Sequence, residues 1–149
     1  MTAALPSPLR LATWNVNSLG VRLPQVLDWL AAQSASGQPV DVLALQELKL
    51  TDEKFPHSAL AEAGYQTVAF GQKTYNGLAL VSRLAPTEVV RNIPGFEDEQ
   101  SRVIAATYGE GEDRLRVISA YFPIGQAPGT DKFAYKMRWL SALHAWVAS

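Results

Sequence analysis

Polar side chains with the chemistry to act on a phosphate follow the apolar run 40–45. Gln46, Glu47 and Lys49 come directly after this run, which reads as a strand buried on both faces. Ligands gather where the strands of an open α/β sheet end. A carboxylate with a lysine two residues on can hold a hard cation such as Mg²⁺ beside a phosphate. The alternative is that Glu47 only forms a surface ion pair with Lys49.

Two further segments end in polar residues of the same kind. Asn15 and Asn17 follow a predicted strand at 9–14, and Tyr121 ends a predicted strand at 115–121. If these strands are neighbours of 40–45, the polar groups converge. Asn15 can then donate to a phosphate oxygen, and the Tyr121 hydroxyl can do the same. The simpler alternatives are that the asparagines are turn residues and that the tyrosine hydroxyl faces water.

Hydrolysis also needs a general base or a second metal carboxylate, and the sequence offers none in a convincing position. His57 is expected to be solvated near the start of a short helix, and His144 to lie on a helix face. Asp98 and Glu99 lie in an acidic loop that we interpret as solvated surface. The residues therefore predict half of a catalytic site.

Alternating strands and helices indicate an α/β fold. The order strand, helix, strand over residues 9–45 predicts a crossover unit with two parallel strands. The last helix, at 131–148, is expected to bury Phe133, Met137, Leu140, Leu143 and Val147. The predicted strands are 9–14, 40–45, 65–70, 77–82, 87–92, 103–108 and 115–121, and the predicted helices are 23–33, 56–63 and 131–148.

Composition narrows the class of protein. The chain has 149 residues, 48% of them apolar, which suits one domain with a substantial core. The net charge of −1 provides no global positive field, so contact with a polyanion must use local patches or a metal ion. The absence of cysteine excludes disulfides and thiolate metal sites. No run is long enough for a membrane span, so we expect a cytoplasmic protein without membrane contact.

Several blocks together resemble the exodeoxyribonuclease III family of apurinic/apyrimidinic endonucleases, within the endonuclease/exonuclease/phosphatase superfamily. The blocks are residues 14–19 with Arg22, 45–49, 75–80, 101–104, 121–123, and Lys132-Phe133 with Lys136. The resemblance implies a four-layer α/β/β/α sandwich and Mg²⁺-dependent cleavage of duplex DNA at abasic sites, with 3′-5′ exonuclease activity. Mn²⁺ is an alternative metal. The full-length form is expected to be a monomer.

By position in these blocks, the resemblance assigns roles to eight residues. Glu47 corresponds to the metal carboxylate, with Asn17 near the metal, and Asn15 and Tyr121 correspond to catalytic residues. The residues assigned to substrate binding are Lys49, Tyr75, Asn76 and Arg102. Leu48 departs from the threonine that is usual between the glutamate and the lysine.

Family members continue into a Gly-Asp-x-Asn block and a Ser-Asp-His block, and neither occurs here. We therefore expect residues 1–8 to be a loose tail and residues 9–149 to be the N-terminal portion of a single domain, inactive by itself. Two alternatives remain open. One is another metal-dependent phosphoesterase of the superfamily, and the other is a non-catalytic module that binds DNA or a partner.

Overall fold

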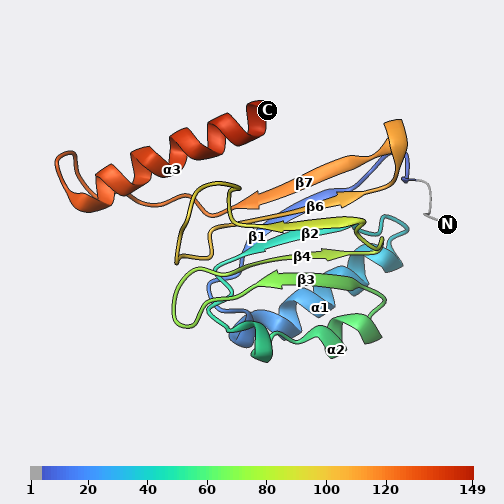
Figure 1. Ribbon diagram of the computed structural model, residues 1–149. Helices are drawn as coiled ribbons and strands as arrows, with labels where there is room; N and C mark the ends of the chain where they lie inside the picture. The colour runs from blue at the N-terminus through green and yellow to red at the C-terminus, as the bar shows by residue number, and fades with distance from the viewer. Residues whose placement is uncertain (1–4) are drawn as a thin grey trace.

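Two β-sheets pack against each other in the computed structural model, which describes residues 5–149 (Figure 1). The first sheet has the order β1-β2-β4-β3, and the second has the order β5-β6-β7. The strands of the first sheet are β1 (Leu11–Asn15), β2 (Val42–Gln46), β3 (Gln66–Phe70) and β4 (Leu78–Ser82). Those of the second are β5 (Glu88–Arg91), β6 (Val103–Tyr108) and β7 (Leu115–Ala120).

The crossover unit predicted from the sequence is present. β1 and β2 are parallel neighbours, and the helix α1 (Leu19–Ala35) connects them. The helix begins four residues earlier than the expected 23, so Pro24 lies inside it rather than in its first turn. The early start has a tertiary cause, because the Leu19 amide donates to the Leu48 carbonyl and the Leu19 side chain is fully buried.

Alternate residues of β2 face two different cores, which explains its continuous apolar run. Leu43 and Leu45 pack in a cluster with α1. Val42 and Ala44 pack in a second cluster, between the sheets. That second cluster also contains Leu78 and Leu80 of β4 and Ile104, Ala106 and Tyr108 of β6.

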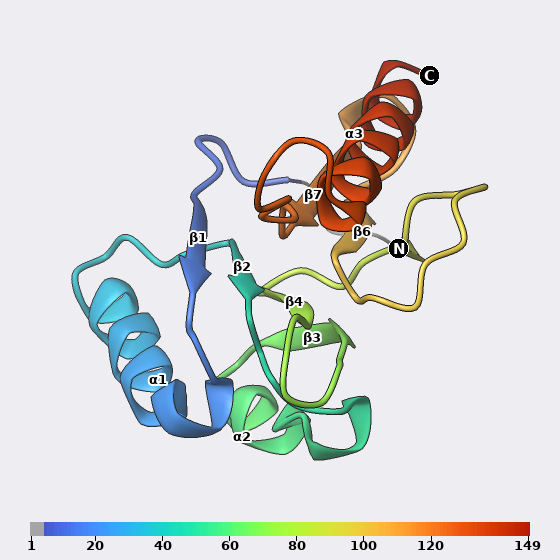
Figure 2. The same ribbon diagram turned by 90° about the vertical axis from the view of Figure 1, so that its left-hand side faces the viewer.

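Helices cover the outer faces of both sheets, which confirms the expected four-layer α/β/β/α arrangement. α1 and the short helix α2 (His57–Glu62) lie against the first sheet, and α3 (Asp131–Ala148) lies on the side of the second (Figure 2). Single 3₁₀ turns occur at Asp52–Lys54 and Gly111–Asp113.

The buried stripe predicted for α3 is confirmed for Leu140 and Leu143, which pack against the cluster around Trp139, and is wrong for Met137 and Val147. Met137 and Val147 are 48% and 60% exposed, whereas Trp139 is fully buried. Tyr135 and Trp146 pack around Trp139 in a cluster with β6 and β7. Large aromatic rings bury more area than Met or Val, so the stripe that contains them faces the sheet.

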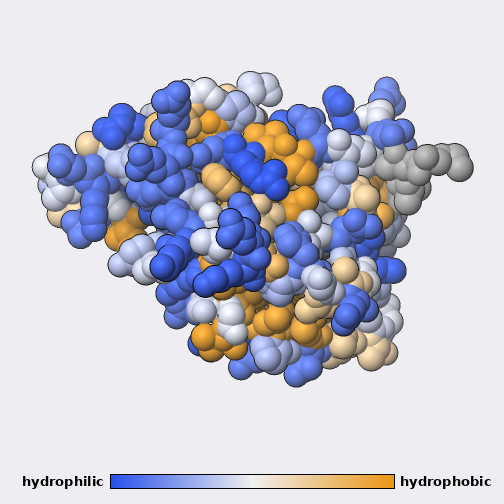
Figure 3. All heavy atoms as spheres, turned by 60° about the horizontal axis from the view of Figure 1, so that its bottom comes forward, coloured by the Kyte–Doolittle hydropathy of each residue, from blue (hydrophilic) through white to orange (hydrophobic). Residues whose placement is uncertain are grey.

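Residues 5–8 form neither helix nor strand, and Leu5 packs against the cluster between the sheets. The first four residues of the expected tail lie outside the described residues. Within residues 5–149, no helix is both long and apolar enough to cross a membrane. The face shown in Figure 3 is largely hydrophilic, with smaller hydrophobic patches between the polar side chains.

Candidate functional site

A pocket of about 570 Å³ opens where β2 and β7 end, beside the start of α3. Four segments that are far apart in the sequence supply its walls. The lining residues are Glu47, Gln72, Tyr75, Asn76, Gln100, Arg102, Tyr121, Pro123, Ile124, Gly125, Gln126, Lys132 and Tyr135. Five of the eight site residues expected from the sequence are among them, namely Glu47, Tyr75, Asn76, Arg102 and Tyr121.

Glu47 and Tyr121 meet across the two sheets. The Tyr121 hydroxyl donates to Glu47 Oε1 at 2.5 Å. The convergence that the sequence suggested therefore occurs, although Tyr121 follows a strand of the second sheet rather than a neighbour of β2. This hydrogen bond, together with burial and the negative charge of Glu47, raises the pKa of Tyr121, and the nearby Arg102 cation opposes the rise. Tyr121 thus stays a hydroxyl donor at neutral pH.

Arg102 holds the backbone and the ring of Tyr121. Its Nη1 donates to the Tyr121 carbonyl at 3.0 Å, and its own carbonyl accepts from the Tyr121 amide at 2.8 Å. The guanidinium lies 5.2 Å from the centre of the Tyr121 ring and 5.9 Å from that of Tyr135, at cation–π distance. Gln100 Oε1 accepts from Arg102 Nε at 2.7 Å. Arg102 is therefore fixed in the wall of the pocket.

The chain leaves β2 through a turn that fixes the Glu47 backbone. Glu47 and Lys49 have φ angles of 57° and 56°, in the left-handed region that non-glycine residues seldom adopt. The Glu47 carbonyl accepts from the Ser18 amide at 2.8 Å, and the Lys49 amide donates to the Asn76 carbonyl at 3.1 Å. Hydrogen bonds on both sides of the turn hold this conformation in place.

Asn76 belongs to the same wall of the pocket and is 6% exposed. Its side-chain amide donates to Gln72 Oε1 at 3.0 Å, and that oxygen also accepts from the Ser101 amide at 2.8 Å. Tyr75, the preceding residue, is 67% exposed. The network therefore supports the loop that presents the Tyr75 ring at the mouth of the pocket.

The other three expected site residues lie beside the pocket and not in its lining. Asn15 Oδ1 accepts from the Asn17 amide at 3.2 Å, which is the turn role that the sequence left open. Asn17 Oδ1 accepts from Lys49 Nζ at 2.5 Å. The structure thus joins Asn15, Asn17 and Lys49 in one chain of hydrogen bonds next to Glu47.

The sequence did not predict that Tyr135 of α3 lines the pocket and pairs with Asp98. Tyr135 donates to Asp98 Oδ2 at 2.5 Å, and Asp98 Oδ1 accepts from the Gln100 amide at 2.9 Å. Asp98 is half-buried and bonded, so the expectation of a solvated residue is wrong for it, whereas Glu99 is exposed. Burial and the bond to Asp98 raise the pKa of Tyr135, while Arg102 opposes the rise. Long-range pairing of this kind leaves no signal in local spacing.

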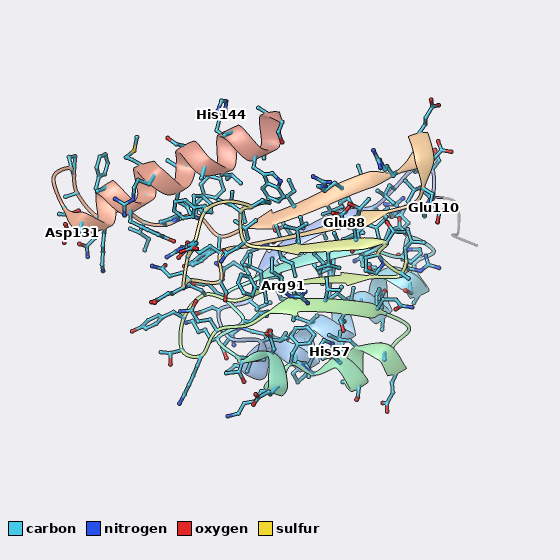
Figure 4. All side chains as sticks on the ribbon, viewed as in Figure 1. His57, Glu88, Arg91, Glu110, Asp131 and His144 are labelled. Carbon is cyan, nitrogen blue, oxygen red and sulfur yellow. The ribbon has the colours of Figure 1, made fainter. Side chains whose placement is uncertain are left out.

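The two histidines lie away from the pocket lining (Figure 4). His57 is exposed, as expected, and its ring also packs against Phe55 and its Nδ1 bonds Thr67 Oγ1. His144 is exposed on the outer face of α3. Neither histidine lines the pocket that contains Glu47.

One carboxylate alone faces the pocket among the residues described. Glu47 is the single Asp or Glu of the lining, and no three His, Cys, Asp or Glu side chains in residues 5–149 form a metal-binding group. Mg²⁺ binds through one or two carboxylates and completes its coordination with water and substrate phosphate. The donor set therefore fits a metal shared with a substrate and does not fit a metal held by these side chains alone.

A four-layer α/β/β/α sandwich with a pocket at the strand ends is the class that the fold and the site define. The chain belongs to the Endonuclease/Exonuclease/phosphatase family, whose model matches residues 12–148. It is 33% identical over 141 residues to exodeoxyribonuclease III of Haemophilus influenzae. The resemblance seen in the sequence is thereby confirmed.

Solved structures agree with this assignment. A 3′ phosphatase from Neisseria, NExo, bound to a product DNA hairpin, is 48% identical with a TM-score of 0.83, covering 93% of this chain and 51% of that one. An AP endonuclease from Archaeoglobus fulgidus is 32% identical with a TM-score of 0.82, covering 93% and 51%. The Haemophilus alignment covers 93% of this chain and 51% of that protein. The chain thus spans about half the length of the relatives it matches.

Proposed function

We propose that this chain is part of a DNA-processing phosphoesterase that acts on the 3′ ends of duplex DNA. The observation that carries the proposal is the hydrogen bond from Tyr121 to Glu47 in a pocket that also contains Arg102 and Lys132. A carboxylate, a hydroxyl donor and two cationic residues are together suited to a phosphate and a divalent metal. Relatives described as a 3′ phosphatase and a 3′-5′ exonuclease, both NExo from Neisseria, are 48% and 49% identical to the chain.

Each residue of the pocket has a defined task in this proposal. Glu47 would hold a divalent cation, Mg²⁺ or Mn²⁺, with Asn17 nearby. When bound, such a cation supplies Lewis-acid stabilisation of charge on the phosphate. With a phosphate bound, the single hydroxyl hydrogen of Tyr121 would be donated to a phosphate oxygen instead of to Glu47, and Arg102 would keep Tyr121 oriented and add positive charge to the wall. Asn15 remains a candidate donor to the same phosphate.

Duplex DNA would be held at the mouth of the pocket. Lys49, Tyr75 and Asn76 come from two loops beside Glu47, and they are the proposed substrate-binding residues together with Arg102. Cations contact backbone phosphates, and an exposed ring can pack on a sugar or a base. Because the net charge is −1, we expect these local contacts to provide the affinity.

Cleavage at abasic sites is a second candidate activity. The similarity to an AP endonuclease from Archaeoglobus fulgidus at 32% identity favours it. A phosphoester other than DNA is a third possibility for the same pocket, because Glu47 and Tyr121 would serve any phosphate.

The natural protein that contains residues 1–149 tests these candidates on four substrates. These are a duplex with a 3′-phosphate end, a duplex with a 3′-hydroxyl end, a duplex with one internal abasic site, and p-nitrophenyl phosphate. We expect Mg²⁺-dependent release of phosphate or nucleotides from the 3′ ends, lost with EDTA. Hydrolysis of p-nitrophenyl phosphate without any action on DNA would overturn the proposal. Cleavage of the abasic duplex alone would select the second candidate.

Glu47→Gln tests the metal role, with Glu88→Gln on β5 as the matched control. Loss of the carboxylate should abolish Mg²⁺-stimulated activity in E47Q, because an amide has no charge to offset that of the cation. E88Q removes an exposed carboxylate that is not part of the pocket lining, and its activity should match that of the unmodified protein. Equal activity of both variants would exclude Glu47 as the metal carboxylate.

We further propose that residues 1–149 are inactive by themselves. The described lining of the pocket has a single carboxylate and no histidine. If Glu47 holds the metal, the described lining offers no second carboxylate or histidine to act as the general base that activates water. Incubation of the purified 149-residue chain with each DNA substrate and Mg²⁺ should give no product above a no-protein control. Clear cleavage would contradict this.

A further inference from the structure

A second polar contact joins the two sheets next to the Glu47–Tyr121 hydrogen bond. Gln46 Nε2 donates to Ser119 Oγ at 3.0 Å, and Ser119 is buried. Gln46 immediately precedes Glu47, and Ser119 lies two residues before Tyr121 on β7. The two inter-sheet hydrogen bonds are therefore successive contacts along the same pair of strands.

The alternation of side chains explains why these residues meet. On β2, Val42, Ala44 and Gln46 point to the same face, and the first two pack in the cluster between the sheets. On β7, Val117 and Tyr121 pack against that same cluster, so Ser119 between them faces β2 as well. The contact between β2 and β7 is thus apolar along most of its length and polar at the end nearest the pocket.

The Gln46 amide is also held by its own sheet. Its Nε2 lies 2.9 Å from Thr13 Oγ1 on β1 and 3.2 Å from the Ala44 carbonyl. Three acceptors surround two amide hydrogens, so the donor is fixed relative to the first sheet. A pair of apolar side chains at this position would allow several distances between β2 and β7. A hydrogen bond is directional and is lost beyond about 3.5 Å, so it restricts this distance.

We propose that Gln46 and Ser119 are positioning residues that set the spacing of the two sheets at the pocket, so that the Tyr121 hydroxyl reaches Glu47. Glu47 and Tyr121 follow strands of different sheets, so the hydrogen bond between them needs a link that sets how far apart those sheets lie at the pocket. The Gln46–Ser119 hydrogen bond provides that link one step away. The kinetic test below depends on the proposed function, and the structural test does not.

Three variants of the natural protein that contains this chain separate positioning from general stabilisation. Ser119→Ala removes the acceptor on β7, and Ser119→Thr restores it. Thr13→Val is the matched control, because it removes one hydroxyl partner of Gln46 and leaves two acceptors for its two hydrogens. On a 3′-phosphate duplex we expect S119A to lower kcat about 5- to 20-fold with KM within twofold. T13V and S119T should stay within about twofold in both constants.

A double-variant cycle tests whether Ser119 acts through Tyr121. In a Tyr121→Phe background the hydroxyl is already gone, so adding S119A should lower kcat less than twofold further. A merely structural role would give the full 5- to 20-fold loss again, and this result would overturn the proposal. Gln46→Met, which keeps the side-chain length but removes the amide, should reproduce the kinetics of S119A.

Crystal structures of S119A and T13V give a readout that does not need activity. We expect the distance from the Tyr121 hydroxyl oxygen to Glu47 Oε1 to exceed 3.5 Å in S119A and to remain a hydrogen bond in T13V. An unchanged distance in S119A would overturn the positioning role. A protein that hydrolyses none of the phosphoesters would refute the proposed function instead, and the crystallographic comparison would still decide this inference.

Discussion

Tyr121 and Glu47 share a hydrogen bond of 2.5 Å although they lie 74 residues apart and follow strands of different sheets. Each residue comes just after its strand has ended, where the chain leaves the sheet and its side chain lines the pocket. Arg102 holds Tyr121 from the opposite side, through the peptide groups and the ring. The pair is therefore a product of how the two sheets pack.

Removal of the Tyr121 hydroxyl should affect catalysis far more than removal of a comparable hydroxyl nearby. Tyr121→Phe takes away the hydroxyl that donates to Glu47 in the structure and to a phosphate oxygen in the proposed substrate complex. A hydrogen bond to a charged group contributes about 1.5–3 kcal/mol, so we expect kcat/KM on a 3′-phosphate duplex to fall about 10- to 100-fold. Steady-state kinetics of the natural protein that contains this chain provide the measurement.

Tyr135→Phe is the control for this variant. It also breaks a tyrosine-to-carboxylate hydrogen bond in the pocket wall, but its partner is Asp98. Its kcat/KM should change less than threefold. Similar losses in both variants would mean that the pocket needs general rigidity and not the Tyr121 hydroxyl.

Stability should decline in alkaline solution because of these tyrosines. The pKa values of Tyr121 and Tyr135 are both raised, the first mainly by its bond to Glu47 and the second mainly by burial. Above pH ~10, where an unfolded tyrosine loses its proton, the native state retains these protons and the unfolded chain does not. The stabilisation is therefore complete below pH ~10 and is lost as the pH rises further.

Urea unfolding of the chain at pH 9 and pH 11 measures this dependence. The midpoint of the unmodified chain should fall between the two pH values. It should fall less in Tyr135→Phe, because that variant no longer has the proton that the native state retains. A Tyr135→Phe variant with the same pH dependence as the parent would contradict the assignment.

Much of the fold was predictable because each strand and helix has a distinctive local pattern. The bounds predicted for β6 and α3 match the structure, since β6 is a continuous buried run that stops at Gly109 and α3 begins just after the Thr130 cap. Failures arose where tertiary contacts decide. α1 starts early because Leu19 is buried and bonded to the turn after β2. α3 packs Trp139 and Trp146 on the second sheet beside the expected Leu140 and Leu143, and so leaves Met137 and Val147 exposed.

The site residues that directly follow a strand could be predicted, because an apolar run in the sequence shows where the strand ends. Glu47 and Tyr121 both end apolar runs, and the structure brings them together. Gln72, Gln100 and Tyr135 come from loops and from the start of a helix, and local spacing does not indicate what they contact. The sequence also left open whether the Asn15 side chain faces the pocket or forms a turn, and in the structure its Oδ1 accepts a hydrogen bond from the Asn17 amide.

The corrected stripe of α3 gives a stability prediction. Trp139 is fully buried, whereas Met137, two residues earlier, is 48% exposed. Trp139→Ala should lower the free energy of unfolding by about 3–5 kcal/mol, and Met137→Ala by less than about 1 kcal/mol. Urea denaturation followed by circular dichroism compares them. An equal loss in the free energy of unfolding for both variants would mean that Met137 is packed as tightly as Trp139, and would contradict this burial pattern.

Ile124 is expected to contribute to DNA binding through its apolar surface. It lines the pocket and is nevertheless 80% exposed, so a bound nucleotide can cover it. Partial burial of an isoleucine contributes about 1 kcal/mol, which corresponds to about a fivefold change in affinity. Ile124→Ala should therefore raise KM for a 3′-phosphate duplex about fivefold and leave KM for p-nitrophenyl phosphate unchanged.

Val21→Ala, at an exposed apolar residue on α1 outside the pocket lining, should change neither constant. If I124A raised both KM values equally, Ile124 would be shaping the phosphate site itself and not contacting the nucleotide.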